Sequence, residues 1–198
     1  NISRSITPRE LIADDSIELV INLTIPHAHY EVSRAAIDAG KHVWSEKPLS
    51  VERGKGQELV DTAEKAGVLL GCAPDTFLGG GHQTCRKLID DGWIGIPQHA
   101  VAFLAGAGHE SWHPDPRFYY EPGGGPMLDM GVYYLTCLVQ LLGPVSSVVG
   151  LTKITRSERL ITSEPLRGTK MTVQVPTHIQ GLIEFTNGAH AAIITSFD

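Results

Sequence analysis

The sequence predicts an α/β protein: the C-terminal part of a doubly wound parallel sheet, followed by an α+β part with a mainly antiparallel sheet. Three short apolar runs within residues 17–71 alternate with two helical patterns and short loops. Such alternation is typical of parallel strands joined by right-handed crossover helices. From residue 145 onward polar and apolar residues alternate, and Thr186-Asn187-Gly188-Ala189 between two such runs favours a β-hairpin.

The first part begins with a short helix and an apolar strand. Thr7-Pro8 precedes a helical start, because proline is tolerated in a first helical turn. The run over residues 17–24 is rich in β-branched residues, as expected for a strand buried on both faces. A helix over residues 28–39 follows and ends at Gly40. Its predicted apolar face consists of Val32, Ala35, Ala36 and Ala39.

The next elements complete two strand–helix–strand units. Residues 42–44 and 68–71 predict the second and third strands. Between them, Ser50 is the predicted cap of a helix that runs to about residue 66 and ends at Gly67. The predicted apolar positions of that helix are Leu59, Val60 and Ala63.

The alternation of strands and helices ends near residues 73–75, where we place a domain boundary. Residues 84–91 and 127–142 predict helices, and residues 98–104 predict a strand. Gly143-Pro144 ends the second helix, since proline cannot continue it. The later strands lie within residues 145–198.

Composition excludes several classes of protein. The chain has 198 residues, 42% of them hydrophobic, and a formal net charge of −6. With no basic cluster in the sequence, we expect no nucleic-acid partner. No run approaches the roughly 18 apolar residues of a membrane span, and the first residues do not resemble a signal peptide. Three cysteines without metal-type spacing indicate free thiols in the cytoplasm.

One dense cluster of polar residues follows the second predicted strand: AGKHVWSEKPLS, residues 39–50. It leaves a strand at its carboxyl end, where open α/β sheets bind ligands. Within it, Pro48 restricts the backbone of Lys47. A partly desolvated lysine near a cofactor can donate or accept a proton. The alternative interpretation is a surface salt bridge between Lys47 and Glu46.

A second cluster is the glycine turn and helix start at residues 122–134, PGGGPMLDMGVYY. Asp129 and Tyr133 are four residues apart and therefore share one face of a helix. They would present a carboxylate and a phenol to a ligand. The alternative is structural: Asp129 favours the helix dipole, and Tyr133 is a core aromatic.

Together the two clusters resemble the NAD(P)-dependent oxidoreductases named after glucose–fructose oxidoreductase and inositol dehydrogenase. The resemblance runs from about residue 17 to residue 196. AGKHVWSEKPLS matches the family's AGKHVxxEKP motif, and GGGPMLDMGVYYLTCLVQLLGPV matches its GGGxLxDxGxHxxD helix. Tyr133 stands where most members have histidine. The family's T-P-x-x-H loop also matches, although Ile25 intervenes between Thr24 and Pro26.

The resemblance implies a role for each matched residue. Lys47 would bind cofactor and substrate hydroxyls and take part in proton transfer, with Glu46 near the nicotinamide ribose. Asp129 would bind and orient the substrate, and Tyr133 would bind it and exchange a proton with the reacting oxygen. Three further residues, in the loop after the first strand, would line the NAD or NADP cofactor: Thr24, Pro26 and His29.

The resemblance also implies the domain organisation. Residues 1–74 would be a partial Rossmann domain whose first strands and GxGxxG turn are missing from this sequence. Residues 75–198 would be an α+β domain for substrate binding and oligomerisation, incomplete at its C-terminus. The family's second sheet also forms subunit interfaces, so we expect a homodimer or homotetramer.

Other candidates are weaker. Trp112 and His113 lie in a proline-rich loop and could bind a sugar by ring stacking and hydrogen bonding, or be structural. The remaining histidines, His109 among them, lack metal-ligand spacing, so we expect no metal site.

These features favour a cytoplasmic oxidoreductase that transfers a hydride between a nicotinamide cofactor and a secondary alcohol or carbonyl carbon of a sugar, cyclitol or related polyol. The alternative is a non-enzymatic sugar-binding or regulatory module that retained the substrate pocket, because the phosphate-binding turn is absent from this sequence. A strand followed by GxGxxG upstream would discriminate between them. A purely structural protein would leave Lys47, Asp129 and Tyr133 unexplained.

Overall fold

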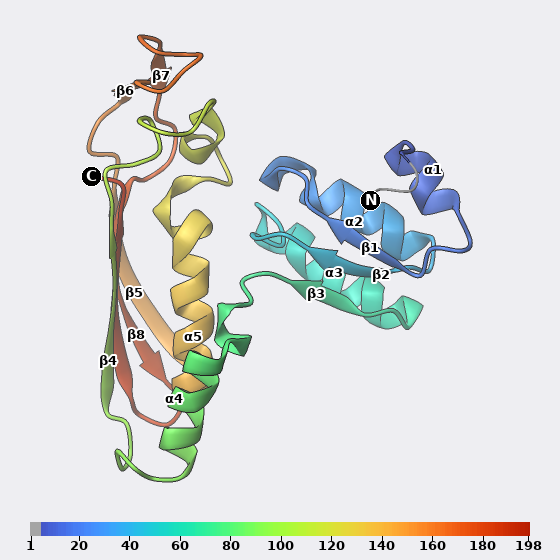
Figure 1. Cartoon of the computed structure of the whole chain (residues 1–198). Helices are drawn as coiled ribbons and strands as arrows, with labels where there is room; N and C mark the ends of the chain where they lie inside the picture. The colour runs from blue at the N-terminus through green and yellow to red at the C-terminus, as the bar shows by residue number, and fades with distance from the viewer. Residues whose placement is uncertain (1–4) are drawn as a thin grey trace. The chain divides into compact units, whose positions relative to one another are not determined.

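The computed structural model describes residues 5–198, which fall into two compact units. Unit 1 is Asn1–Ala73 and unit 2 is Pro74–Asp198. Each unit has a sheet and helices of its own (Figure 1).

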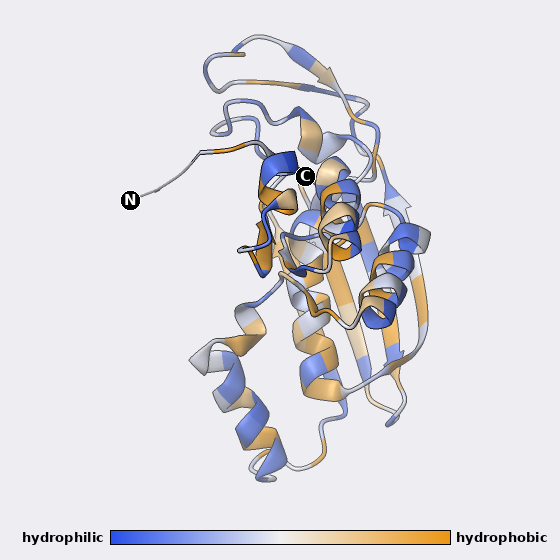
Figure 2. Ribbon diagram, turned by 90° about the vertical axis from the view of Figure 1, so that its right-hand side faces the viewer, coloured by the Kyte–Doolittle hydropathy of each residue, from blue (hydrophilic) through white to orange (hydrophobic). Residues whose placement is uncertain are grey.

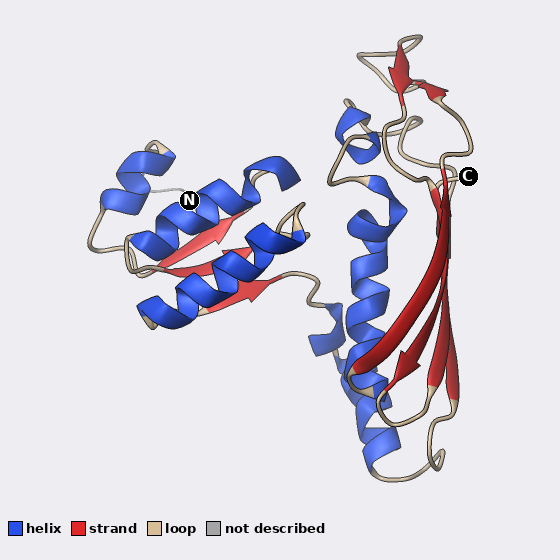
Figure 3. Ribbon diagram, turned by 180° about the vertical axis from the view of Figure 1, so that it is seen from behind, coloured by secondary structure: helices blue, strands red, loops and turns tan. Residues whose placement is uncertain are grey.

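Unit 1 contains a parallel three-stranded sheet in the order β1-β2-β3. The strands are β1 (Leu19–Asn22), β2 (His42–Ser45) and β3 (Leu70–Cys72). The helices α2 (His29–Asp38) and α3 (Arg53–Ala66) cover one face of this sheet (Figure 3). The short helix α1 (Pro8–Ala13) precedes them, and the side chains of Thr7 and Glu10 form its capping box. The prediction of a parallel sheet with crossover helices is confirmed.

The core of unit 1 lies between the sheet and these two helices. Val20 and Val43 point inward and pack against Ala36, Ile37 and Leu59. The neighbouring strand residues point to the other face, which is exposed: Ile21 retains 60% of its accessible surface. The prediction that the first strand is buried on both faces is therefore wrong for the described residues, since β1 alternates between exposed and buried positions.

Two details of the helices differ from the predictions. The buried face of α2 comprises His29, Ser33, Ala36 and Ile37 rather than the predicted alanine-rich face. Two of these residues are polar, because they bind partners at the end of β1. Helix α3 starts at Arg53, three residues after the predicted cap; the Ser50 hydroxyl instead accepts a hydrogen bond from the Glu52 N–H at 3.2 Å.

Unit 2 is built on a mixed four-stranded sheet in the order β4-β9-β8-β5. Its strands are β4 (His99–Ala105), β5 (Val145–Lys153), β8 (His178–Phe185) and β9 (His190–Ser196). β4 runs parallel to β9 and the other pairs are antiparallel, as predicted for a mainly antiparallel sheet. The predicted hairpin joins β8 to β9. A separate pair consists of β6 (Glu158–Leu160) and β7 (Lys170–Thr172).

One face of the unit 2 sheet is packed and the other is open. Helix α5 (Val132–Leu142) covers the packed face, where Leu138 and Leu142 contact Ile183, Phe185 and Ile193. Helix α4 (Gly80–Asp90) contacts α5 and begins one turn earlier than predicted. Parts of the strands of this sheet are hydrophobic and are orange in Figure 2. Several of their apolar residues are exposed, among them Val101, Val149 and Leu182.

The helix predicted over residues 127–142 is interrupted near its start. Met127–Gly131 forms a π-helical turn, and the regular α-helix begins at Val132. The chain packs closely at Gly131, where a Cβ atom would lie 2.5 Å from the sulfur of Met127 and would displace that side chain. Such turns occur frequently at functional sites.

Candidate active site

The carboxyl edge of the unit 1 sheet is polar and buried. Asn22, Ser45 and Cys72 end the three strands and lie side by side in register. The Asn22 Nδ2 atom donates hydrogen bonds of 3.0 Å to the carbonyl oxygen of His29 and to the hydroxyl of Ser33. Its Oδ1 atom accepts the hydroxyl of Thr24 at 2.7 Å. Asn22 thereby joins the loop that follows β1 to the first turns of α2.

His29 ties that loop to the one after β2. Its side chain is 1% exposed. Nδ1 lies 2.6 Å from the carbonyl oxygen of Pro48, and Nε2 lies 2.8 Å from the carbonyl oxygen of Thr24. Both ring nitrogens thus face the protein backbone. Of the residues predicted to line a cofactor here, Thr24 is exposed and Pro26 is half-buried.

Glu46 and Lys47 follow β2 at the same edge. The Glu46 N–H donates to the carbonyl oxygen of Asn22 at 2.9 Å, which extends the pairing of β1 and β2. The Glu46 carboxylate accepts the backbone N–H of Lys47 at 3.0 Å, and both side chains are half-buried. A carboxylate has about four acceptor sites, so Glu46 could also accept ribose hydroxyls. These donors and acceptors fit the ribose and amide of a nicotinamide nucleotide.

Cys72 completes this edge as a neutral thiol. Burial, together with the charge of Glu46, raises the pKa of the Cys72 thiol to about 12. The thiol donates to the carbonyl oxygen of Ala73 at 2.7 Å. Since the thiolate is disfavoured, Cys72 is a packing residue rather than a nucleophile.

In unit 2, Asp129 lies in the π-helical turn and faces His109. The Asp129 Oδ2 atom is 3.2 Å from Nε2 of His109, and the two side chains are 10% and 12% exposed. The His109 ring is stacked on Tyr119 with a centroid distance of 3.7 Å. Burial and the negative charge of Asp129 both raise the pKa of Tyr119.

Tyr133 lines a cavity of about 490 Å³ between α5 and the start of α4. Six further residues of unit 2 line it: Asp75, Thr76, His82, Met130, Tyr134 and Cys137. Nδ1 of His82 lies 2.8 Å from the carbonyl oxygen of Thr76, so it carries the ring proton and leaves Nε2 as an acceptor. The cavity therefore offers a phenol, an imidazole and a carboxylate to a polar ligand.

The proline-rich loop predicted to bind a sugar lies beside His109. Trp112 is 61% exposed, and its ring centroid is 5.3 Å from that of His109. The His113 Nδ1 atom accepts the backbone N–H of Asp115 at 3.1 Å. An exposed indole is a suitable stacking surface for a sugar ring.

A buried ionic network supports this loop. Arg159 donates to the carboxylate of Glu110 at 2.5 Å and to the carbonyl oxygen of Phe197 at 2.7 Å, and it also pairs with Asp198. The Tyr120 hydroxyl donates to the other Glu110 oxygen at 2.6 Å. Gly108 must lack a side chain, since its Cβ would lie 2.2 Å from that oxygen.

Sequence reasoning missed His109, Tyr119 and the network around Arg159. His109 matches neither the loop motif of His29 nor a metal-ligand spacing, and it pairs with a carboxylate instead. One signal is present in the sequence: in GHESWHP, only Ser111 separates His109 and Glu110 from the Trp112-His113 pair.

Within residues 5–198, no three His, Cys, Asp or Glu side chains are grouped so that they could hold a metal ion. In the same residues, no helix has the length and apolarity needed to cross a bilayer.

Comparison with known proteins gives matches along nearly the whole chain. Residues 3–73 match the family model described as "Oxidoreductase family, NAD-binding Rossmann fold". Residues 82–198 match the model of the GFO/IDH/MocA C-terminal domain.

Among curated relatives, an oxidoreductase of Schizosaccharomyces pombe is 30% identical over 84% of this chain and 48% of its own. A 1,5-anhydro-D-fructose reductase of Ensifer adhaerens is 35% identical over 67% of this chain and 40% of its own. The chain thus spans half or less of the length of these relatives. The crystal structure of an NAD binding oxidoreductase from Klebsiella pneumoniae superposes with a TM-score of 0.84 and 27% identity, covering 96% of this chain and 50% of that one.

Proposed function

The chain belongs to the GFO/IDH/MocA family of oxidoreductases, and from this membership we propose that it is part of an NAD(P)-dependent dehydrogenase or reductase of polyols. The hydride would pass between the nicotinamide and a secondary alcohol or carbonyl carbon of a sugar or cyclitol. The relative named 1,5-anhydro-D-fructose reductase supports this substrate class.

The observation that carries the proposal is the polar edge after β2. There Glu46 and Lys47 leave the carboxyl end of a parallel strand, the position at which open α/β sheets bind nucleotides. A bound nicotinamide would supply the hydride chemistry, with Glu46 and the hydroxyl of Thr24 at its ribose and amide. His29, whose ring nitrogens face backbone carbonyls, would hold the two loops in place.

Proton transfer and substrate binding are assigned to five side chains. Lys47 would bind substrate hydroxyls and take part in proton transfer. Tyr133 would donate or accept the proton at the reacting oxygen as the carbon loses or gains hydride. Asp129 would accept a second substrate hydroxyl and so orient the ring. Trp112 would stack on the sugar, with His113 as a hydrogen-bonding neighbour.

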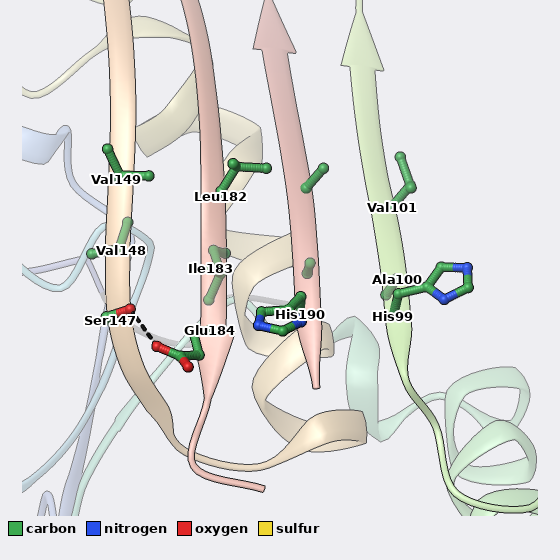
Figure 4. Close-up of a pocket in the computed structure, with 12 residues that line it drawn as sticks. His99, Ala100, Val101, Ser147, Val148, Val149, Leu182, Ile183, Glu184 and His190 are labelled. Carbon is green, nitrogen blue, oxygen red and sulfur yellow. Dashed lines mark hydrogen bonds between the residues drawn. The ribbon is translucent and has the colours of Figure 1, made fainter. Parts of the chain in front are cut away.

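The open face of the unit 2 sheet supports assembly into a homodimer or homotetramer. Its central row is apolar and exposed: Val149, Leu182 and Val101 retain 64%, 61% and 71% of their accessible surface. A polar row borders it, in which Ser147 donates to Glu184 at 2.8 Å and His190 lies beside Glu184 (Figure 4). Apolar patches of this kind mark protein interfaces. The protein would act in the cytoplasm, where its three cysteines remain reduced.

A substrate screen tests the proposed function. The purified protein is mixed with NAD⁺ or NADP⁺ and with levoglucosan, scyllo-inositol, myo-inositol or D-glucose, and the absorbance of reduced nicotinamide is followed. The reverse direction is assayed with 1,5-anhydro-D-fructose and NADPH or NADH. We expect turnover with at least one polyol. Turnover with simple aliphatic alcohols but none of the sugars or cyclitols would contradict the substrate class.

A further inference from the structure

The partner of Asp129 is a histidine that is constrained from several sides. Tyr119 lies parallel to the His109 ring, with an angle of 8° between the planes, and Phe197 meets it edge-on at 4.7 Å. The His109 backbone N–H donates to the Tyr120 hydroxyl at 3.4 Å. A ring packed in this way cannot rotate without breaking the aromatic stack. Its Nε2 atom is therefore held toward the Asp129 carboxylate.

The opposite ring nitrogen indicates which atom carries the proton. Nδ1 of His109 is fully buried and has no hydrogen-bond partner among the described residues. A proton on Nδ1 would be a buried donor without an acceptor, which costs free energy. With the proton on Nδ1, Nε2 would be an acceptor that faces another acceptor, the Oδ2 atom of Asp129. The arrangement thus favours the tautomer with its proton on Nε2, which donates to Oδ2 of Asp129.

We infer that His109 is the positioning residue for Asp129: it donates Nε2–H to the carboxylate and fixes the direction in which that carboxylate accepts a substrate hydroxyl. The inference rests on the proposed role of Asp129 in substrate binding. A fixed carboxylate favours hydroxyls with one orientation on the sugar ring, because a hydrogen bond weakens steeply when it is misaligned. His109 would therefore affect the choice of substrate without touching it.

The surrounding groups are compatible with a His109 ring that donates from Nε2. Tyr119, stacked on the ring, has its pKa raised by burial and by Asp129, so it remains an uncharged phenol. Glu110, the next residue after His109, is the other carboxylate to consider. Its carboxylate is already bound by Arg159 and Tyr120. Asp129 is thus the carboxylate to which His109 donates.

Nitrogen NMR of ¹⁵N-histidine-labelled protein tests the tautomer directly, with His109→Gln used to assign the signal. Two histidines serve as internal references. His82 donates from Nδ1 to Thr76, whereas Nδ1 of His42 accepts the N–H of Leu69 at 2.9 Å. We expect His109 to resemble His42, with a bare Nδ1 and a protonated Nε2, at neutral pH. A spectrum like that of His82, or one with both nitrogens protonated, would overturn the inference.

Steady-state kinetics test whether His109 affects substrate binding by Asp129. In His109→Leu the carboxylate loses the donor at Nε2 of His109, and KM for the polyol should rise by about 10- to 100-fold, the effect expected for a hydrogen bond to a charged group. KM for the nicotinamide should be unchanged. His109→Gln retains an N–H donor and should recover most of the loss. Equal KM values in both variants and the wild type would overturn the inference, as would a Gln variant no better than Leu.

The two measurements separate this inference from the proposed function. The NMR measurement of the tautomer requires no turnover, so it tests the inference about His109 even if no polyol is oxidised. Absence of turnover would count against the proposed function alone. If His109→Leu fails to fold, the Gln variant and the wild type still give the comparison: a Gln variant with KM more than about 10-fold above wild type would overturn the inference.

Discussion

The Nδ1 atom of His29 lies 2.6 Å from the carbonyl oxygen of Pro48, so a buried side chain of α2 holds the loop that carries Lys47. The same ring reaches the carbonyl oxygen of Thr24 through Nε2 at 2.8 Å. One imidazole thus joins the loops that follow β1 and β2. The geometry of this sheet edge depends on a residue that was predicted to contact the cofactor.

Replacement of His29 tests this role. His29→Phe keeps an aromatic ring but removes the ring N–H, so a buried backbone carbonyl oxygen loses its donor at a cost of about 1–3 kcal/mol. We expect a clear drop in the free energy of unfolding, measured in urea. The control is His27→Phe, two residues earlier and exposed, which should leave stability unchanged. Equal stability of the two variants would show that the ring does not hold the loops.

Lys47 is the residue whose loss should affect turnover most. General acid–base groups typically contribute about 10²- to 10⁴-fold in rate, so Lys47→Ala should lower kcat/KM by that factor. The folded state should persist, as measured by thermal melting. Lys65→Ala, at the exposed end of α3, is the matched control and should retain full activity. Activity of Lys47→Ala within a few-fold of wild type would contradict the assignment.

Substitution of Tyr133 tests whether its phenol takes part in catalysis or is only a core aromatic. Tyr133→Phe keeps the ring in the wall of the cavity and removes only the hydroxyl. If the hydroxyl exchanges a proton with the substrate, the rate falls and the melting temperature changes little. The opposite result, a lower melting temperature with turnover retained, would identify a structural hydrogen bond instead.

Cys72 should make the stability of the protein depend on alkaline pH. Burial raises the pKa of its thiol to about 12, whereas a cysteine in an unfolded chain ionises near about 8.5. Because the unfolded state loses this proton first, stability is fully present below about pH 8.5 and falls as the pH rises toward 12. Urea unfolding at several pH values should show this loss in the wild type, and a smaller one in Cys72→Ala.

Thiol reactivity provides an independent check on the same residue. At pH 8 iodoacetamide should modify the exposed Cys85 rapidly and Cys72 slowly in the folded protein, as followed by peptide mass spectrometry. Rapid modification of Cys72 would mean that its thiolate is accessible.

The open sheet face should determine the oligomeric state. Leu182→Asp places a charge in the centre of the apolar row, and we expect it to convert the proposed dimer or tetramer into monomers. Light scattering coupled to size exclusion measures the mass. Val60→Asp introduces the same charge at another exposed apolar residue, on α3, and should leave the assembly intact. If both variants keep the wild-type mass, another surface forms the interface.

The order of strands and helices could be predicted because local rules decide it. Apolar runs, glycines at helix ends and the Asn187-Gly188 turn each act over a few residues. Gly67 and Gly143, for example, have the positive φ values of 67° and 95° expected of residues that end helices.

The buried polar contacts could not be predicted in this way. Ser33 lies on the inner face of α2 because its hydroxyl accepts a hydrogen bond from Asn22. His29 lies there because its ring contacts the carbonyl oxygens of Thr24 and Pro48. His109 and Asp129 are 20 positions apart and meet only in the folded chain. Helical periodicity ranks such residues as surface positions, since it counts polarity and not partners.

The π-helical turn at Met127–Gly131 has a consequence for the evolution of this segment. Such a turn is formally an α-helix that has gained one residue, and each residue of an α-helix advances by about 100° around its axis. Deletion of a residue between Asp129 and α5 would restore a regular helix and rotate Asp129 by about 100° relative to α5, away from His109. Insertions and deletions tolerated in ordinary loops should therefore be selected against here, whereas replacement of one side chain by another would leave the phase unchanged.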